Sequence, residues 1–333
     1  MSGGRSVLFS AAADSYELAV REIRGEFGRE VRIQRVGAEL GRVDGPSVRD
    51  LAAACDAGRI MFVRHLTEEI ASFEELPPSY ELAEVILGEL PQYPEALAVQ
   101  AWTDDAGTGG SYYHRIEEAL TGRGVAVTRS GQEYVVSCFV GRKAILLGLN
   151  RRADSLSDWP GGRMRLARGD ERVSRSEFKL EEAIATFGLE LPAHGKAVDL
   201  GAAPGGWTRI LRQHGQEVWS VDPGALDPRL RGDRRIHHEA TTAGRFFAAN
   251  RVRFDVVVND MRMDQVTSAR MMLDAAGHLR RDGLAIVTLK GGGRNPLDGA
   301  RRGLDVLREQ YDVRHARQLH HNRNEITVIA HHR

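Results

Sequence analysis

Four charged residues of this 333-residue chain stand where strands and a helix are expected to meet. Asp260 and Lys290 each end a buried, all-apolar strand. Because the carboxyl ends of strands line the ligand crevice of an open α/β sheet, both side chains should lie at one edge of the sheet. Glu325 opens a last, antiparallel strand at that edge, and a helix packed beside the sheet can add Lys179.

Two lysines beside two carboxylates are suited to removing a proton from a poor nucleophile such as a hydroxyl group. A lysine becomes a general base when burial or a second cation lowers its pKa. Arginine keeps its proton in proteins, so the choice of lysine carries information here. Of 46 basic residues all but four are arginine, and the four are Lys143, Lys179, Lys196 and Lys290.

From residue 176 onward, apolar strands alternate with helices, which predicts a parallel α/β sheet with helices on both faces. The strands are expected at 197–200, 217–221, 236–239, 254–258, 284–289, 313–319 and 325–330. No helix separates the last two, so they should form an antiparallel hairpin. Residues 6–66 and 95–150 are typical of small α+β modules, with one short strand expected at 60–63.

The segment 198–208 joins the first strand of the C-terminal domain to its first helix and reads Val-Asp-Leu-Gly-Ala-Ala-Pro-Gly-Gly-Trp-Thr. Its small residues let the backbone approach a ligand closely. The spacing is not G-x-G-x-x-G and Pro204 lies in the turn, which argues against a dinucleotide pyrophosphate. The next strand ends at Asp222, where an acid can accept hydrogen bonds from ribose hydroxyls. The loop and Asp222 together favour a nucleoside-type cofactor, and S-adenosylmethionine is the natural candidate.

The stretch 199–207 also resembles a known family. Asp-Leu-Gly-Ala-Ala-Pro-Gly-Gly-Trp is similar to the S-adenosylmethionine loop of the FtsJ/RrmJ-like 2′-O-ribose RNA methyltransferases. The resemblance implies an enzyme with a Rossmann-like, S-adenosylmethionine-dependent methyltransferase domain. The cofactor-binding residues expected from the loop and from the resemblance are Ser176, Gly201, Ala203, Pro204, Gly205, Gly206, Trp207, Asp222 and Asp260.

The four charged residues match the Lys-Asp-Lys-Glu tetrad of the same family. The resemblance implies that all four are catalytic, with Lys290 as the general base. Lys179 and Glu325 would orient the ribose and the base. Asp260 would lie between the base and the methyl-bearing end of the cofactor.

Three segments, 174–183, 199–208 and 317–328, resemble the RlmM-like branch of this family, which methylates a cytidine 2′-hydroxyl in 23S ribosomal RNA. Members of the branch carry a ferredoxin-like segment and a THUMP RNA-binding domain before the catalytic domain. The strand–helix–three-strand pattern of residues 95–150 fits a THUMP module. The expected domains are a ferredoxin-like segment at 1–66, a THUMP-like domain at 67–158, a basic linker at 159–175 and an FtsJ-like methyltransferase domain at 176–333.

The sequence departs from the family at one cofactor contact. Where the family has an acid after the third strand, this chain reads Glu239-Ala240. Either Glu239 contacts the cofactor from one position earlier, or the adenine is held by backbone alone. The N-terminal part is also shorter than in the best-known members, which leaves the exact nucleotide open.

Two features of the sequence argue against methylation of RNA bases. A C5-pyrimidine methyltransferase needs a cysteine nucleophile, but Cys55 and Cys138 both precede the catalytic domain. An enzyme that methylates exocyclic amines would show Asn-Pro-Pro-Tyr where residues 259–262 read Asn-Asp-Met-Arg. A methyltransferase for another RNA, such as tRNA, and a non-catalytic RNA-binding or ribosome-assembly factor on the same fold stay open.

Composition sets broad limits on partners and location. The 46 basic and 46 acidic residues balance, which excludes a globally basic nucleic-acid binder but allows a local basic face. No apolar run approaches about 18 residues, so we expect no membrane span and a cytoplasmic protein. The adjacent pairs His237-His238 and His320-His321 should point to opposite sides of a strand, so no metal site is expected.

RNA is the expected partner, with no obligate protein partner. Its phosphates would meet a strip of basic residues near the predicted linker. The residues of this strip are Arg142, Lys143, Arg151, Arg152, Arg163, Arg165 and Arg168.

Overall fold

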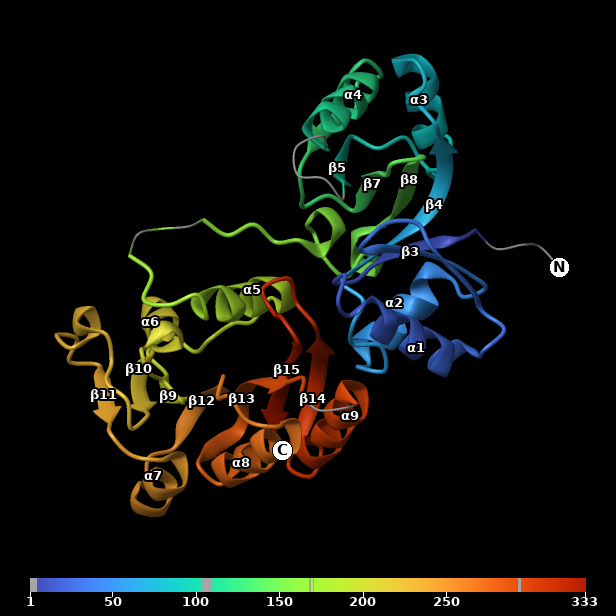
Figure 1. The fold of residues 1–333 in the computed structure, drawn as a ribbon. Coiled ribbons are helices and arrows are strands. Elements are labelled where there is room, and N and C mark those ends of the chain that lie inside the picture. The colour runs from blue at the N-terminus through green and yellow to red at the C-terminus, as the bar shows by residue number, and fades with distance from the viewer. Residues whose placement is uncertain (1–4, 104–108, 168, 170, 293–294) are drawn as a thin grey trace. The chain divides into compact units, whose positions relative to one another are not determined.

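The computed structural model divides into two compact units, Met1–Met164 and Arg165–Arg333 (Figure 1). It describes residues 5–103, 109–167, 169, 171–292 and 295–333. The boundary between the units falls inside the predicted linker at 159–175. Within the described ranges, every helix is too short or too polar to cross a membrane.

The first unit contains an eight-stranded sheet with the order β2-β3-β1-β4-β8-β7-β5-β6. Its strands are β1 (Val7–Ser10), β2 (Arg32–Arg35), β3 (Leu40–Asp44), β4 (His65–Phe73), β5 (Ala96–Thr103), β6 (Ala126–Thr128), β7 (Tyr134–Val140) and β8 (Ile145–Arg151). Its helices are α1 (Tyr16–Phe27), α2 (Val48–Asp56), α3 (Ser79–Leu87) and α4 (Gly109–Thr121). Strand β4 pairs with β1 on one side and with β8 on the other, so the predicted domain boundary after residue 66 lies within this strand. The division into a ferredoxin-like segment and a THUMP-like domain stays a prediction.

The strand predicted at 60–63 is wrong, because its backbone donors are used elsewhere. The buried carboxylate of Glu22, on α1, accepts hydrogen bonds from the backbone N–H of Met61 at 2.9 Å and of Phe62 at 3.0 Å. These bonds attach the segment to a helix instead of a neighbouring strand. The strand begins later, at His65.

The second unit contains a seven-stranded sheet with the order β11-β10-β9-β12-β13-β15-β14. Its strands are β9 (Lys196–Leu200), β10 (Glu217–Val221), β11 (Ile236–Glu239), β12 (Phe254–Asn259), β13 (Leu279–Lys290), β14 (Tyr311–Arg317) and β15 (Glu325–His332). Its helices are α5 (Glu177–Phe187), α6 (Gly206–Gln213), α7 (Ala243–Ala249), α8 (Gln265–Ala276) and α9 (Pro296–Leu307). The first five strands in sequence are parallel, and β15 is antiparallel to both β13 and β14. The predicted α/β fold and its closing hairpin are confirmed.

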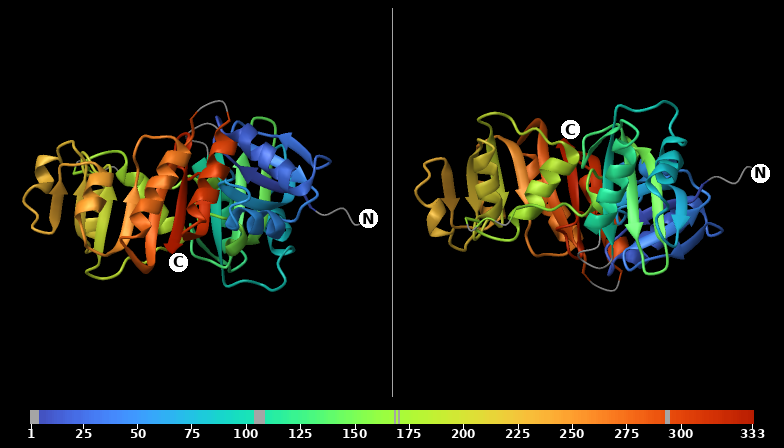
Figure 2. Two further views of the ribbon diagram at one scale, coloured as in Figure 1. Left: turned by 90° about the horizontal axis from the view of Figure 1, so that it is seen from below. Right: turned by 90° about the horizontal axis from the view of Figure 1, so that it is seen from above.

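Apolar residues on both faces of the central strands explain why helices cover both faces of this sheet. Strands β12 and β13 are almost entirely buried, as expected for parallel strands between two helical layers. Side chains of α5 and α6 pack on one face, in a core that includes Leu180, Trp207 and Leu211. Helices α7, α8 and α9 follow one another on the other face (Figures 1 and 2).

The strand register brings distant residues to one edge of the second sheet. Lys290, at the end of β13, pairs directly with Glu325, at the start of β15. On the other side, Asn259 at the end of β12 pairs with Leu200 at the end of β9. The loop after Leu200 and the residue after Asn259 therefore start side by side.

The Glu22 contact makes a testable prediction for the first unit. Glu22→Ala should lower the free energy of unfolding by about 1–3 kcal/mol for each of the two buried N–H groups left without a partner. Glu26→Ala is the matched control, because Glu26 lies one turn later on α1 and forms a part-exposed ion pair with Arg59 at 2.7 Å, of a kind worth at most about 1 kcal/mol. Urea unfolding followed by circular dichroism measures both, and equal losses in the two variants would contradict the assigned role.

Candidate active site

The four residues predicted to be catalytic lie together at the carboxyl edge of the second sheet. The Lys179 ammonium contacts Asp260 Oδ1 at 3.1 Å and Glu325 Oε1 at 2.5 Å. The Lys290 ammonium contacts Asp260 Oδ1 and lies 3.2 Å from Glu325 Oε2. Each carboxylate therefore bridges both lysines. The set is a closed ring of two positive and two negative groups, mostly shielded from solvent.

A fifth residue, Thr288, belongs to this ring and was not predicted. Its hydroxyl donates to Asp260 Oδ1 at 2.6 Å and accepts from the Lys290 ammonium at 3.1 Å. Thr288 lies two residues before Lys290 on β13, on the same face of the strand. That alternation is the only sequence signal that could have found it.

The two carboxylates control the charge state of Lys179. Burial alone would lower the pKa of this lysine, but the charges of Asp260 and Glu325 outweigh burial and raise its pKa above the ordinary value. Lys179 therefore carries a positive charge at neutral pH.

The predicted cofactor loop, residues 201–205, runs from β9 to α6 beside the ring. Gly201 and Gly205 have φ angles of 74° and 113°, in the left-handed region that favours glycine. A Cβ atom at Gly201 would collide with the side chain of Met261. The loop is thus packed against the residue that directly follows Asp260.

Asp222 ties this loop to the end of β10. Its Oδ2 accepts from the backbone N–H of Ala203 at 3.2 Å and its Oδ1 from that of Gly224 at 2.6 Å. A carboxylate oxygen has a second lone pair, so Asp222 can still accept from ribose hydroxyls. This donor and acceptor set, at a tight loop with no basic residue of its own, fits a nucleoside cofactor without a pyrophosphate, as S-adenosylmethionine is.

Two of the predicted cofactor residues are engaged within the protein. Trp207 is only 3% exposed, and its indole N–H donates to the carbonyl of Ser176 at 2.8 Å. A Cβ atom at Gly206 would meet the hydroxyls of Ser174 and Ser176, which lie 2.6 Å from each other. Gly206 and Trp207 therefore hold the segment before α5 against the loop. Their contact with the cofactor, like that of Ser176 and Pro204, stays a prediction.

Glu177 was not predicted as a site residue, but it holds the segment that precedes α5 in place. Its buried Oε1 accepts from the backbone N–H of Val173 at 2.5 Å and of Ser174 at 3.2 Å. Its Oε2 accepts from Arg209 of α6 at 2.9 Å. Glu177 therefore joins this segment, α5 and α6 around the loop.

Histidines of both predicted pairs contact neighbouring groups: His238 lies 3.1 Å from the carbonyl of Asp222, and His321 lies 2.8 Å from Glu182. His237 lies 2.7 Å from Glu217, and its ring lies against Trp219. In the part of the chain that the structure describes, no three His, Cys, Asp or Glu side chains are grouped to hold a metal ion. Glu239 ends β11, and its carbonyl accepts from the backbone N–H of Asp222 at 3.1 Å. Which of Glu239 and Ala240 contacts the adenine stays open.

The predicted basic strip is only partly available for phosphates. Arg163 donates to Glu39 at 2.6 Å and to the carbonyl of Thr103 at 3.0 Å. Arg151 pairs with Glu133 at 3.7 Å, and Arg168 lies outside the described residues. The strip as an RNA-contacting feature stays a prediction.

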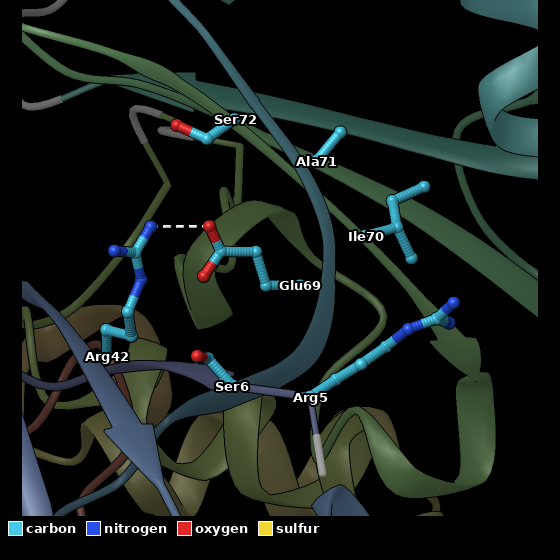
Figure 3. A pocket seen from close by; sticks show the side chains of 7 residues that line it. All are labelled: Arg5, Ser6, Arg42, Glu69, Ile70, Ala71 and Ser72. Carbon is cyan, nitrogen blue, oxygen red and sulfur yellow. Dashed lines mark hydrogen bonds and ion pairs between the residues drawn. The ribbon is translucent and has the colours of Figure 1, made fainter. Parts of the chain in front are cut away.

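A hollow in the first unit contains none of the predicted site residues. It lies beside β1, β3 and β4 and is lined by Arg5, Ser6, Arg42, Glu69, Ile70, Ala71 and Ser72 (Figure 3). Arg42 forms an ion pair with Glu69 there. Arg5 is likewise paired, with Glu89 at 2.5 Å. These mutually neutralised charges do not define a ligand class.

This chain is similar to several known proteins. Residues 172–288 match the FtsJ-like methyltransferase family. The ribosomal RNA large subunit methyltransferase M of Halorhodospira halophila is 35% identical over 82% of this chain and 80% of its own length. The enzyme of that name from Alkalilimnicola ehrlichii is 32% identical over 89% and 85%. A crystal structure of TrmN from Thermus thermophilus covers 98% of this chain and 100% of that chain, with a TM-score of 0.38 and 16% identity.

The second unit is therefore an FtsJ-like methyltransferase domain, and S-adenosylmethionine is its cofactor. The sequence similarity extends well beyond that domain, over most of both chains. The chain belongs to the family of the ribosomal RNA large subunit methyltransferase M.

Asp199, on β9 beneath the loop, generates a prediction about pH. Burial raises the pKa of Asp199 to about 7, although the Thr208 hydroxyl donates to its carboxylate at 2.7 Å. The folded state therefore holds a proton that the unfolded state has released above its ordinary pKa of 3.8. Stability should fall as the pH rises from about 4 to 7 and then level off.

Asp199→Asn should remove this fall, because an amide is neutral at every pH in the window and can still accept from Thr208. The measurement is the thermal unfolding temperature of both proteins at a series of pH values from 5 to about 8. Parallel pH profiles for the wild type and the variant would refute the assignment.

Proposed function

We propose that this protein transfers a methyl group from S-adenosylmethionine to a ribose 2′-oxygen of ribosomal RNA, with a cytidine of the 23S RNA as the target. The observation that carries the proposal is the closed ring of Lys179, Asp260, Lys290 and Glu325 beside the cofactor loop. The similarity to ribosomal RNA large subunit methyltransferases supports ribosomal RNA as the substrate.

When bound, S-adenosylmethionine supplies a sulfonium-activated methyl group. Asp222 and the backbone of residues 201–205 would hold its nucleoside part, because these groups offer acceptors and close approach at the strand ends. Asp260 contacts both lysines and directly precedes Met261, whose side chain packs against Gly201 of the loop.

Lys290 is the group we assign as general base. A ribose hydroxyl must lose its proton as its oxygen attacks, and a neutral amine within hydrogen-bond reach can accept it at Nζ. The raised pKa of Lys179 keeps this lysine protonated. Its fixed charge suits the other task, which is to orient the hydroxyl and stabilise negative charge on the attacking oxygen.

Asp260, Glu325 and Thr288 act as positioning residues for the two lysines. Lys290 Nζ has three oxygen neighbours from these side chains. Such a set of acceptors fixes the position of Nζ at the edge of the sheet. Orientation of this kind contributes strongly to a displacement between two bound partners.

The first unit is proposed to help recognise the RNA, with a ferredoxin-like segment at 1–66 and a THUMP-like domain at 67–158. The family relationship supports this assignment, since the similarity to the curated relatives extends well beyond the catalytic unit. We further expect the protein to act in the cytoplasm without an obligate protein partner.

Conservative substitutions distinguish the roles of the two lysines. Lys290→Arg should lower kcat by about 100-fold or more, because arginine keeps the charge but cannot accept a proton. Lys179→Arg should retain far more activity, because only its charge is required. Lys196→Ala, at the opposite end of β9, is the control and should behave as wild type.

The assay is methyl transfer from radiolabelled S-adenosylmethionine to ribosomal RNA from a strain that lacks the gene, followed by digestion and nucleoside analysis. Label on a cytidine 2′-oxygen in 23S RNA is the expected result. Label on a base would refute the base assignment and the ring mechanism. Label only on tRNA would change the substrate, and no label together with intact RNA binding would favour a non-catalytic assembly factor.

A further inference from the structure

The loop between β14 and β15, residues 318–324, is held in place by a buried carboxylate of helix α5. Glu182 is 2% exposed, and its two oxygens accept from the backbone N–H of His320 at 2.8 Å and of His321 at 2.7 Å. The Nδ1 of His321 lies 2.8 Å from the same carboxylate, which can only accept, so this nitrogen carries the proton. Three donors therefore fix the loop to the helix.

Side chains within the loop fix its remaining backbone. The side-chain oxygen of Asn322 accepts from the backbone N–H of Leu319 at 2.8 Å and from the Thr327 hydroxyl at 3.0 Å. The amide of Gln318 donates to the carbonyl of Arg323 at 2.6 Å. Gln318 and Asn322 are both buried. A surface loop with this many internal bonds is preorganised.

The 318–324 loop lies next to the reacting groups in the chain. Glu182 lies three residues after Lys179 on α5, and the loop ends directly before Glu325. The contact of 2.5 Å between Lys179 and Glu325 thus joins α5 to the strand that directly follows this loop. Within this loop Arg323 is exposed, and among the described residues it forms no ion pair.

The charge of the chain is divided unevenly between its two units. Residues 1–164 contain 18 Lys and Arg against 24 Asp and Glu, whereas residues 165–333 contain 28 against 22. Contacts with phosphates supply most of the sequence-independent affinity for nucleic acid. The surplus of positive charge that such contacts need is in the catalytic unit.

We propose that the 318–324 loop is an RNA-contacting element in which Arg323 binds the phosphate next to the reactive ribose. The inference rests on the proposed function, because a 2′-hydroxyl within an RNA chain always lies beside the phosphate on the neighbouring 3′-oxygen. Arg323 stands two residues before Glu325, and its guanidinium offers the paired donors that phosphate oxygens accept. Glu182 is the positioning residue that keeps the loop at a fixed distance from Lys179.

Salt-dependent binding by the full-length protein tests the Arg323 contact. Affinity for a fluorescein-labelled RNA transcript is measured by anisotropy between about 50 and 200 mM salt. Arg323→Gln should weaken binding and reduce the slope of log K against log salt by about one. Arg281→Gln is the matched control, because Arg281 is exposed at the opposite end of β13 in the same unit.

The outcomes separate this inference from the proposed function, because binding is measured without methyl transfer. An unchanged slope in Arg323→Gln overturns the phosphate contact. Equal changes in Arg323→Gln and Arg281→Gln also overturn it, because they indicate diffuse attraction with no defined contact. The affinity for S-adenosylmethionine, measured by calorimetry, should be unchanged in both variants, and a loss there would reassign Arg323 to the cofactor site.

A second variant tests whether the contacts of Glu182 with the 318–324 loop matter for the reaction. Glu182→Gln keeps the size of the side chain but has one accepting oxygen in place of two, so His320 and His321 cannot both keep their bonds. It should raise KM for RNA and lower kcat while the affinity for S-adenosylmethionine stays at the wild-type value. Glu181→Gln, the neighbouring residue, is its control. A Glu182→Gln protein with wild-type KM and kcat overturns the positioning role of Glu182.

Discussion

Two carboxylates that each bridge the same two lysines are the constraint on which the second unit depends. Asp260 and Glu325 each contact both Lys179 and Lys290, so the four groups are shielded from solvent together with their charges compensated. Removing any one would leave an uncompensated charge, which is strongly unfavourable away from water. The ring in turn requires β12, β13 and β15 to be neighbours and α5 to lie at their ends.

Much of this arrangement could be predicted because the charged residues stand at the ends of strands that the sequence also predicts. Asp260 and Lys290 each end an apolar strand, and such ends meet at one edge of a parallel sheet. The register of Lys290 with Glu325 confirms that the last strand starts at the same edge. The segment at 60–63 shows where this reasoning fails. Its apolar run resembles a strand, but the carboxylate of Glu22, 39 residues away, takes its backbone donor at Met61.

Residues whose role depends on a distant partner could not be identified from the sequence. Glu181 and Glu182 are adjacent acids in one helix, and nothing local distinguishes them. In the structure Glu181 pairs with Arg172 at 2.9 Å, whereas Glu182 bonds to backbone 138 residues later in the chain. Thr288 was missed for a related reason, since a hydroxyl in a buried strand usually serves only its neighbours. Tertiary contacts decide these roles, and propensity does not.

Helix α5 explains how the parts of the site keep their spacing. Glu177 attaches it to α6 and the segment over the cofactor loop, Lys179 belongs to the charged ring, and Glu182 holds the 318–324 loop. These three residues share one hydrogen-bonded helix of 11 residues. Because a helix is stiff over that length, the loop that binds the methyl donor and the residues that act on the hydroxyl cannot move independently. Positioning by one rigid element meets the main requirement of a displacement reaction, which is that two bound partners be held at a fixed distance and angle.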